Sequence, residues 1–408
     1  MRPEEVRALL WSFAYFFCML ASYYILRPLR DEMGVAGGVR NLQWLFSATF
    51  VTMLAAVPLY GALVARLPRR RFIPFVYHFF AANLAIFWVL LVLDYERQSV
   101  ARVFFVWISV FNLFAVSVFW SFMADLYTSD QAKRLYGFIA AGGSAGALTG
   151  PALTVFLVER IGTANLLILA LVLLEVAVLC ATRLEVKDQV PRTAENIGGG
   201  VLDGLVMVLR SPYVAGILLW VSLLSIAATF LYFEQAAIVA KASDDPSVRT
   251  RIFATVDLAV GLLTLAVQVF ATGKLIARFG VGPALALLPL VFAAGFAVLA
   301  AAPLLAVVIA FQALQRTANF AISNPAREAL FTVLARDEKY KAKNVIDVVA
   351  VRGADALGGW CFTGLRSLGL EIRGIALVAI ALAAAVFALS VALGRAQERR
   401  SAARGIVS

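Results

Sequence analysis

The chain has 408 residues, of which 62% are hydrophobic and 15% are charged, and it carries a formal net charge of +11. Soluble proteins average about 45–50% apolar and about 25% charged residues, so the composition excludes an ordinary soluble domain and indicates a protein solvated by lipid. The distribution of the basic residues along the chain excludes nucleic acid as the reason for the positive charge.

Apolar segments close to the ~20 residues that cross a bilayer recur along the whole chain. The first follows Arg2 and Arg7, as a signal peptide would, but it is too long for one and further spans follow it. We predict an all-α membrane protein with twelve transmembrane helices, at residues 8–28, 42–66, 72–94, 102–127, 134–158, 163–182, 213–240, 252–273, 281–301, 304–334, 344–366 and 374–394.

The basic residues sort to one side of these spans. With both termini in the cytoplasm, 22 of the 36 Lys and Arg residues fall inside and 10 fall outside. The other four, Arg27, Arg316, Arg327 and Arg352, lie within spans or at their ends. This asymmetry follows the positive-inside rule. It predicts a multi-pass protein of a bacterial inner membrane with cytoplasmic termini.

A basic turn at Gly61–Arg71 returns in a near copy at Gly273–Gly280, an interval close to half the length of the chain. A repeat at half length indicates duplication, hence two pseudo-symmetric six-helix halves. We place the halves at 1–183 and 213–395, with a cytoplasmic tail at 396–408. Between them, 184–212 is a polar, Gly-containing cytoplasmic linker with a short amphipathic segment.

The turn resembles the signature loop between spans two and three of the major facilitator superfamily. Gly61, Leu63, Arg66 and the following arginines match the family pattern, whereas Ala65 and Pro68 replace its aspartate and second glycine. The alternative is that any cytoplasmic turn would be arginine-rich. In the fifth span, Gly146-x-x-x-Gly150-Pro151 resembles the antiporter motif of that superfamily, although small residues four apart are also an ordinary packing face.

Polar residues inside spans are costly and normally face the bundle interior or an aqueous cavity. The tenth span places five of them on one helical face: Gln312, Gln315, Arg316, Asn319 and Ser323. Either these residues only join helices by hydrogen bonds, or they line a central site at the membrane midplane. The polar face around Arg316 favours a cavity for that residue.

Charged and amide residues in the spans supply the remaining candidates. The predicted substrate-binding residues are Arg27, Gln312, Arg316, Asn319 and Arg352. The predicted coupling or gating residues are Arg66, Asp125, Glu175, Glu234, Asp257, Asp347 and Asp355. Two have structural alternatives: Arg27 could reach lipid headgroups or pair with Asp31, and Glu175 could be protonated or paired instead of carrying protons. The single histidine, His78, is interpreted as a packing residue.

The sequence contains no phosphate-binding glycine loop, metal-ligand cluster or nucleophile with a base. We therefore expect no enzyme activity, no catalytic residue, no metal and no cofactor. The three cysteines lie inside apolar runs and form no disulfide framework. Transport would be driven by gradients, as in a secondary carrier.

Three further stretches, Tyr24–Asp31, Phe119–Tyr136 and Pro325–Val349, are similar to the ATP/ADP translocase (nucleotide transporter) family of intracellular bacteria and plastids. The resemblance implies an anionic cargo met by Arg27, Arg316 and Arg352. An arginine fork suits phosphate or carboxylate because it donates two parallel hydrogen bonds.

The predicted function is a secondary active transporter that moves a small anionic organic solute, nucleotide-like on this resemblance, by alternating access. Its expected partners are that solute, the lipid bilayer and protons as coupling ion, with no nucleic acid. A proton-coupled exporter of amphiphilic or drug-like compounds is the first alternative. A membrane scaffold or receptor that moves nothing is the second.

Overall fold

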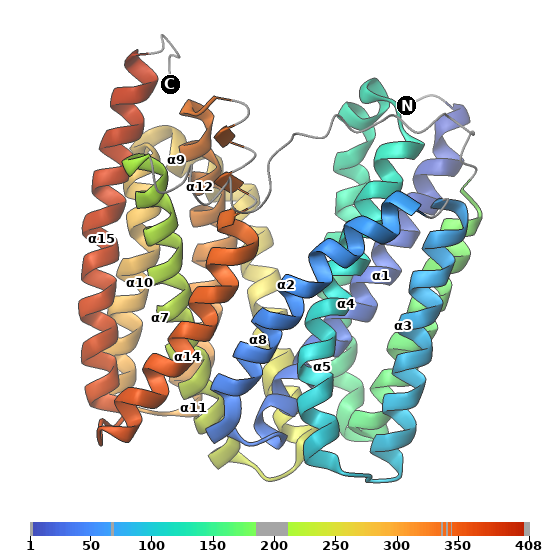
Figure 1. The fold of residues 1–408 in the computed structure, drawn as a ribbon, viewed down its shortest axis with the longest axis horizontal. Coiled ribbons are helices and arrows are strands. Elements are labelled where there is room, and N and C mark those ends of the chain that lie inside the picture. Colours follow the sequence, from blue (N-terminus) through green and yellow to red (C-terminus); the bar gives the residue numbers. More distant parts are fainter. Residues whose placement is uncertain are drawn as a thin grey trace. The chain divides into compact units, whose positions relative to one another are not determined.

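The computed structural model describes residues 3–66, 69–184, 211–335, 338–339, 342–343 and 345–403. Side chains are described at these positions except 3, 4, 63–66, 69–71, 129 and 348. The described residues form helices and turns, and none belongs to a strand (Figure 1). The predicted linker, with its amphipathic segment, falls outside the described residues between 185 and 210, as do the last five residues of the tail.

Five helices build the first half of the chain: α1 (Pro3–Ala36), α2 (Leu42–Arg66), α3 (Arg69–Val92), α4 (Arg97–Leu126) and α5 (Ser129–Thr182). Thr128 begins α5 with a capping box, in which its hydroxyl accepts from the Gln131 N–H and the Gln131 side chain accepts from the Thr128 N–H. Predicted spans five and six both lie in α5, and they are separated at Gly162. A φ of 80° at this glycine breaks the helical path.

The second half contains α7 (Pro212–Ala242), α8 (Pro246–Val267), α9 (Gly273–Phe279), α10 (Val281–Ala301), α11 (Leu305–Ala318), α12 (Asn324–Leu330), α14 (Val351–Ser367) and α15 (Ile372–Ala403). Short π-helices stand at Gln268–Thr272, Asn319–Ser323 and Val345–Ala350. The first joins α8 to α9, the second joins α11 to α12, and the third leads into α14. Predicted span ten is therefore interrupted by one wide turn, whereas the wide turn lies at the end of span eight and at the beginning of span eleven.

Ten helical segments of the described chain are long and apolar enough to cross a membrane. One of them, Asp130–Thr182, holds two predicted spans. The eleventh predicted span, around α14, is not among the ten, and it carries Asp347, Arg352 and Asp355. The chain is thus an all-α membrane protein, and these helices are consistent with the predicted count of twelve.

The helices gather into two compact units. Unit 1 comprises Met1–Val39, Val51–Ala194 and Ser243–Leu258, and unit 2 comprises Arg40–Phe50, Glu195–Ala242 and Ala259–Ser408. Each unit therefore takes most of one half of the sequence and a short stretch of the other half.

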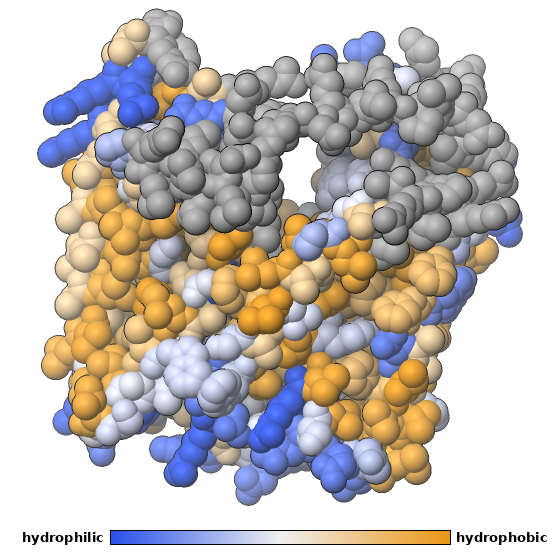
Figure 2. Space-filling model, in the orientation of Figure 1, coloured by the Kyte–Doolittle hydropathy of each residue, from blue (hydrophilic) through white to orange (hydrophobic). Residues whose placement is uncertain are grey.

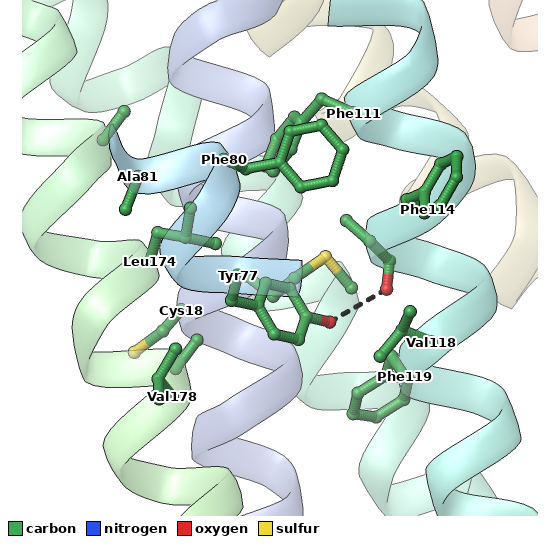
Figure 3. Close-up of a cluster of buried hydrophobic side chains, with 14 of the residues drawn as sticks. Cys18, Tyr77, Phe80, Ala81, Phe111, Phe114, Val118, Phe119, Leu174 and Val178 are labelled. Atoms are coloured by element: carbon green, nitrogen blue, oxygen red, sulfur yellow. Dashed lines mark hydrogen bonds between the residues drawn. The ribbon is translucent and has the colours of Figure 1, made fainter. Parts of the chain in front are cut away.

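Aromatic side chains fill the core of unit 1. Tyr15 packs edge-on against Phe119, with ring centroids 4.9 Å apart. Its hydroxyl donates to Tyr77 at 2.8 Å. The Tyr77 hydroxyl in turn donates to the carbonyl oxygen of Ala115 at 3.0 Å, the bond dashed in Figure 3. The polar ends of these rings are satisfied inside the core, so the rings contribute apolar burial without an unmet hydrogen bond.

Glycines set the approach of α5 to α1. A Cβ at Gly142 would lie 2.6 Å from the carbonyl oxygen of Phe13, and a Cβ at Gly150 would lie 2.8 Å from that of Ala21. Between them, a Cβ at Gly146 would meet the carbonyl oxygen of Phe17. Both rows step by four residues, so one face of each helix follows the other. The glycines of the antiporter-like motif thus form a helix-packing face.

The same packing recurs in unit 2 at the spacing of the repeat. Gly358 of α14 faces Thr229 of α7, whose Cβ would lie 3.2 Å from a Cβ added to the glycine. Gly146 and Gly358 are separated along the chain by the same number of residues as the two basic turns. The residues that these two glycines face, Phe17 and Thr229, are separated by that number as well. The duplication seen in the basic turns therefore extends to the contact between the first and fifth helices of each half.

Large apolar side chains remain exposed on the outside of the helices, among them Phe156 and Phe270 at 70% and 71%. Figure 2 shows hydrophobic residues along the helices and hydrophilic ones gathered near helix ends. A surface of this kind matches the hydrocarbon of a bilayer.

Candidate functional site

A polar cavity of about 140 Å³ lies within unit 2. One side is apolar and consists of α7 and α10 residues that include Leu224 and Phe292. The other side is polar and comes from the tenth span. Its residues are Gln315 of α11, Asn319 of the π-helix, and Asn324 and Arg327 of α12.

The π-helix explains how these four side chains share one face. Their spacings along the chain are four, five and three residues. In a regular α-helix a step of five residues would turn the chain about 140° off the face, because each residue adds about 100°. The π-helix accommodates an additional residue in its turn, so Asn324 and Arg327 keep the side set by Gln315 and Asn319. Such wide turns are rare and are often found at functional sites.

The predicted polar stripe is therefore divided. Gln315 and Asn319 line the cavity, whereas the Gln312 side chain donates to the Gln235 side chain of α7 at 2.7 Å. Arg316 is half-buried and is not among the described residues that line the cavity. Ser323 is buried within the π-helix. The prediction of one face for all five residues was made with a constant period of 3.6 residues, which holds along α11 as far as Ala318 and not through the π-helix that contains Ser323.

Arg327 is the cation of the cavity. Its side chain is 18% exposed, and its Nη2 lies 3.3 Å from Oδ1 of Asp347 in the third π-helix. The neighbouring Glu328 accepts from Nζ of Lys343 at 2.6 Å. These two pairs join α12 to the segment that leads into α14. A predicted coupling residue, Asp347, thus meets an arginine that borders the cavity.

Arg327 was not among the predicted site residues. It lies near the end of a predicted span, where an arginine can reach the membrane surface, and a regular helix would not align it with Asn319. The available signal was its position in the Pro325–Val349 stretch, one of the three on which the predicted similarity to the nucleotide transporters rests.

A second buried arginine lies in unit 1. Arg27 of α1 places Nε 3.9 Å from Oδ2 of Asp257 in α8, and the two side chains are 22% and 1% exposed. Asp31, one of the alternatives given for Arg27, accepts from Arg30 at 3.1 Å. The structure therefore brings together one predicted substrate-binding residue and one predicted coupling residue.

Further ion pairs surround this end of α1. Glu32 accepts from Arg249 at 2.7 Å, and Arg251 donates to both carboxylate oxygens of Glu159 at 2.8 Å. Both arginines belong to the Ser243–Leu258 part of unit 1. Arg27 and Asp257 are thus part of a charged region where α1 meets α8.

The remaining candidates do not converge on the cavity. Arg352 pairs with Asp355 at 3.4 Å, and Arg366 donates to both oxygens of Glu234 at 2.9 and 3.1 Å. Asp125 is exposed near the end of α4. Arg66 is the last residue of α2, and its side chain lies outside the described part.

Glu175 meets His78, with 3.0 Å between Oε1 and Nδ1. The histidine was predicted to be a packing residue with its hydrogen bonding satisfied; Glu175 is its partner, and its side chain is 55% exposed. For the described residues, no group of three or more His, Cys, Asp or Glu side chains is arranged to hold a metal ion.

Comparison with known proteins relates this architecture to a family of transporters. The family model of the Major Facilitator Superfamily matches residues 8–241, more than half of the chain. No curated protein sequence matches.

Several solved structures share the fold at low sequence identity. The crystal structure of the nucleoside transporter NupG is 14% identical, covers 97% of this chain and 99% of its own, and superposes with a TM-score of 0.66. The human organic anion transporter MFSD10 (TETRAN) is 16% identical, with coverage of 95% and 100% and a TM-score of 0.61. A bacterial homologue of the human lysosomal transporter Spinster is 14% identical, with coverage of 98% and 99% and a TM-score of 0.63. The chain belongs to the Major Facilitator Superfamily.

Proposed function

We propose that the protein is a secondary active transporter that moves a small anionic organic solute by alternating access. The solute would bind at the cavity of unit 2, between the apolar wall of α7 and α10 and the polar face of the tenth span. The observation that carries this proposal is Arg327, a largely buried arginine that borders the cavity beside three side-chain amides.

The pairing of this arginine favours an anion as cargo. Burying a charge is costly unless an opposite charge accompanies it, and Asp347 supplies one. The carboxylate of Asp347 occupies the position that a carboxylate or phosphate of the cargo would take. Binding would then exchange one anionic partner of Arg327 for another, and the guanidinium would stay compensated throughout.

The released carboxylate gives a route for coupling. Once the cargo holds Arg327, the Asp347 carboxylate would lose its cationic partner and could take up the coupling ion in its place. Arg27 and Asp257 provide the corresponding elements in unit 1. Protons are therefore the coupling ion in this proposal, and the two six-helix halves, 1–183 and 213–395, would move relative to each other around the bound solute.

The proposed cargo class extends to nucleotide-like anions. Pro325–Val349 is the stretch most similar to the nucleotide transporters, and it contains both Arg327 and Asp347. By their names, two transporters with the same fold carry nucleosides and organic anions. A nucleoside shares its base and sugar with a nucleotide but lacks the phosphate charge, and an organic anion shares only the charge. We place the protein in a bacterial inner membrane with both termini in the cytoplasm, because the basic residues divide accordingly.

A thermal-shift screen of the purified full-length protein tests the proposal. Nucleotides, phosphorylated metabolites, organic acids and lipophilic cations would be compared on the wild type, Arg327→Ala and Arg316→Ala. Arg373→Ala is the matched control, because this exposed arginine of α15 donates only to the carbonyl oxygen of Ala300 among described residues. We expect an anion to stabilise the wild type and the control but not Arg327→Ala.

The Arg316 variant compares the two arginines of the tenth span directly. Retained stabilisation in Arg316→Ala would assign the cargo to Arg327 alone. Stabilisation only by lipophilic cations, unchanged in Arg327→Ala, would contradict the anion proposal and favour the exporter of amphiphilic compounds.

A further inference from the structure

A hydrogen-bonded pair of titratable side chains lies on the outer face of unit 1, away from the cavity just described. His78 of α3 contacts Glu175 of α5 at 3.0 Å, and their side chains are 55% and 39% exposed. Their chain neighbours Tyr77 and Leu174 turn the other way, into the aromatic core (Figure 3). The pair therefore faces outward from the seam between the two helices.

The pair is placed at a depth where lipid is the surrounding medium. His78 is nine residues from the start of α3, which is about 13 Å at 1.5 Å per residue, and Glu175 is seven residues from the end of α5, which is about 10 Å. Exposed apolar side chains accompany it on the same two helices: Phe75, Phe79, Val172, Val176 and Leu179. Ionisable side chains at such depth normally face protein or water, because lipid offers them no hydrogen bonds.

The same seam carries a second polar contact and a groove. Nε1 of Trp88 donates to Oδ1 of Asn165 at 3.1 Å, one α3 residue to one α5 residue, with both side chains partly exposed. An open apolar groove of about 270 Å³ lies next to it on α3, lined by Ala85, Ile86, Val89 and Leu90. We call this surface the α3–α5 face: His78, Phe79, Ile86, Trp88, Asn165 and Glu175.

We propose that the α3–α5 face is the contact surface of a homodimer, and that its partner is a second copy of this chain. A twofold contact brings each patch against itself, so the patch must contain both the donors and the acceptors that it needs. The bond between His78 and Glu175 uses one ring nitrogen and one carboxylate oxygen. The second nitrogen and the second oxygen are available to the same pair of the copy.

The dimer removes the cost that the single chain would carry. Two His–Glu pairs that meet across a twofold axis form a closed group of donors and acceptors, shielded by the surrounding apolar side chains. The exposed Phe79 of each copy has an apolar groove on the other copy to occupy. A partner of different sequence would have to supply this complementarity separately, whereas a copy has it by construction.

Exchanging the histidine at position 78 and the glutamate at position 175, singly and together, tests whether these side chains pair between two copies. Full-length protein labelled with donor or acceptor dyes would be reconstituted into liposomes, and energy transfer followed as lipid is added. We expect the wild type to dissociate along a monomer–dimer curve. His78→Glu and Glu175→His each bring like groups together, so association should weaken at least about tenfold, as the loss of two interhelical hydrogen bonds predicts.

The double variant His78→Glu with Glu175→His restores one acid and one histidine per chain, and we expect it to recover the association. All four proteins would be compared by thermal midpoint and gel filtration, so that misfolding is recognised. Because the exchange also restores the bond within each chain, equal thermal midpoints in all four proteins assign the loss and recovery to the contact between copies, and midpoints that fall and recover with association would contradict the proposal.

Cross-linking tests the position of the contact. In a background with Ala in place of the three cysteines, Phe79→Cys should form a disulfide between copies in the membrane. Phe270→Cys, equally placed on an exposed apolar surface but in unit 2, should not. A wild type that stays monomeric at every lipid ratio, association that ignores the single charge changes, or equal cross-linking at both positions would each overturn the proposal.

Discussion

Two of the buried arginines keep a carboxylate from a distant part of the chain beside them. Arg27 meets Asp257 in unit 1, and Arg327 meets Asp347 in unit 2. The cost of leaving one member alone is greatest in unit 1, where the Asp257 side chain is 1% exposed, and smaller at Asp347, whose side chain is 39% exposed. The pairs therefore hold the arginines charged and oriented while leaving the guanidinium open to exchange of its partner.

The pair in unit 1 gives a prediction for stability. Asp257→Ala leaves Arg27 uncompensated, and we expect it to destabilise the protein by about 3 kcal/mol. Arg27→Met combined with Asp257→Ala should destabilise less than the single Asp257 change, because it removes both charges. Reversible unfolding in detergent or bicelles would measure the three variants. Additive losses would contradict a direct interaction between the two side chains.

At this scale the sequence predicts which residue types matter better than which partners they choose. Arg27, Asp257 and Asp347 were identified because charges are rare within apolar runs. The only protein partner proposed for Arg27 from the sequence was Asp31, one helical turn away and one of several alternatives, whereas Asp257 belongs to the second half of the sequence and meets Arg27 through packing. Long-range pairs of this kind cannot be inferred from spacing in one sequence.

Helix contacts in this protein depend on how closely two backbones approach. Along α1 and α5 that approach is set by Gly142, Gly146 and Gly150, each opposite a carbonyl oxygen of α1. Lipid gives helices no hydrophobic reason to associate, so close van der Waals contact between backbones is a main source of their affinity. The glycine row is accordingly the element on which the packing of unit 1 depends most directly.

Gly146→Ala should separate the two helices. The added Cβ would meet the backbone of α1 at Phe17, which cannot move as a side-chain tip can, and we expect a loss of about 1–3 kcal/mol. Gly137→Ala is the matched control in the same helix, because no atom lies within 4 Å of its added Cβ. It should be neutral or stabilise by up to about 1 kcal/mol, the gain in helix propensity. Equal effects in thermal unfolding would contradict this role for Gly146.

The elements also mark where sequence periodicity stops being informative. The twelve predicted spans agree with the helices to within several residues in most cases, because length and apolarity decide them. The π-helix at Asn319–Ser323 was not predicted, since a constant period carries no sign of one additional residue in a turn. That single turn brings Asn324 and Arg327 to the cavity, and neither was among the predicted site residues.

The whole molecule repeats itself at about half its length, in the basic turns and in the glycine contacts of Gly146 and Gly358. The cavity does not repeat in this way. The three described π-helices all lie in the second half. Asn319–Ser323 comes directly before α12, which contains Arg327, and Val345–Ala350 contains Asp347, which pairs with Arg327. The second half therefore contains the π-helices, whose wider turns change the direction in which polar side chains point. The described helices of the first half, including the glycine-packed α1 and α5, are regular apart from the break at Gly162.

This asymmetry leads to a prediction for alternating access. Asn319 borders the cavity at the start of a π-helix, so a thiol placed there should be reached by water from one side of the membrane at a time. In a background without the native cysteines, Asn319→Cys would be labelled with a membrane-impermeant reagent in vesicles of both orientations. We expect the stabilising anion to raise labelling from one side and lower it from the other, by about tenfold for a shift of 1.4 kcal/mol between the two states.

Ser99→Cys, exposed near the start of α4, is the control, and its labelling should not respond. Labelling at Asn319→Cys that ignores the anion in both orientations would contradict alternating access at this cavity, because a site that opens in turn to each side cannot keep a constant exposure while its cargo changes the populations of the two states.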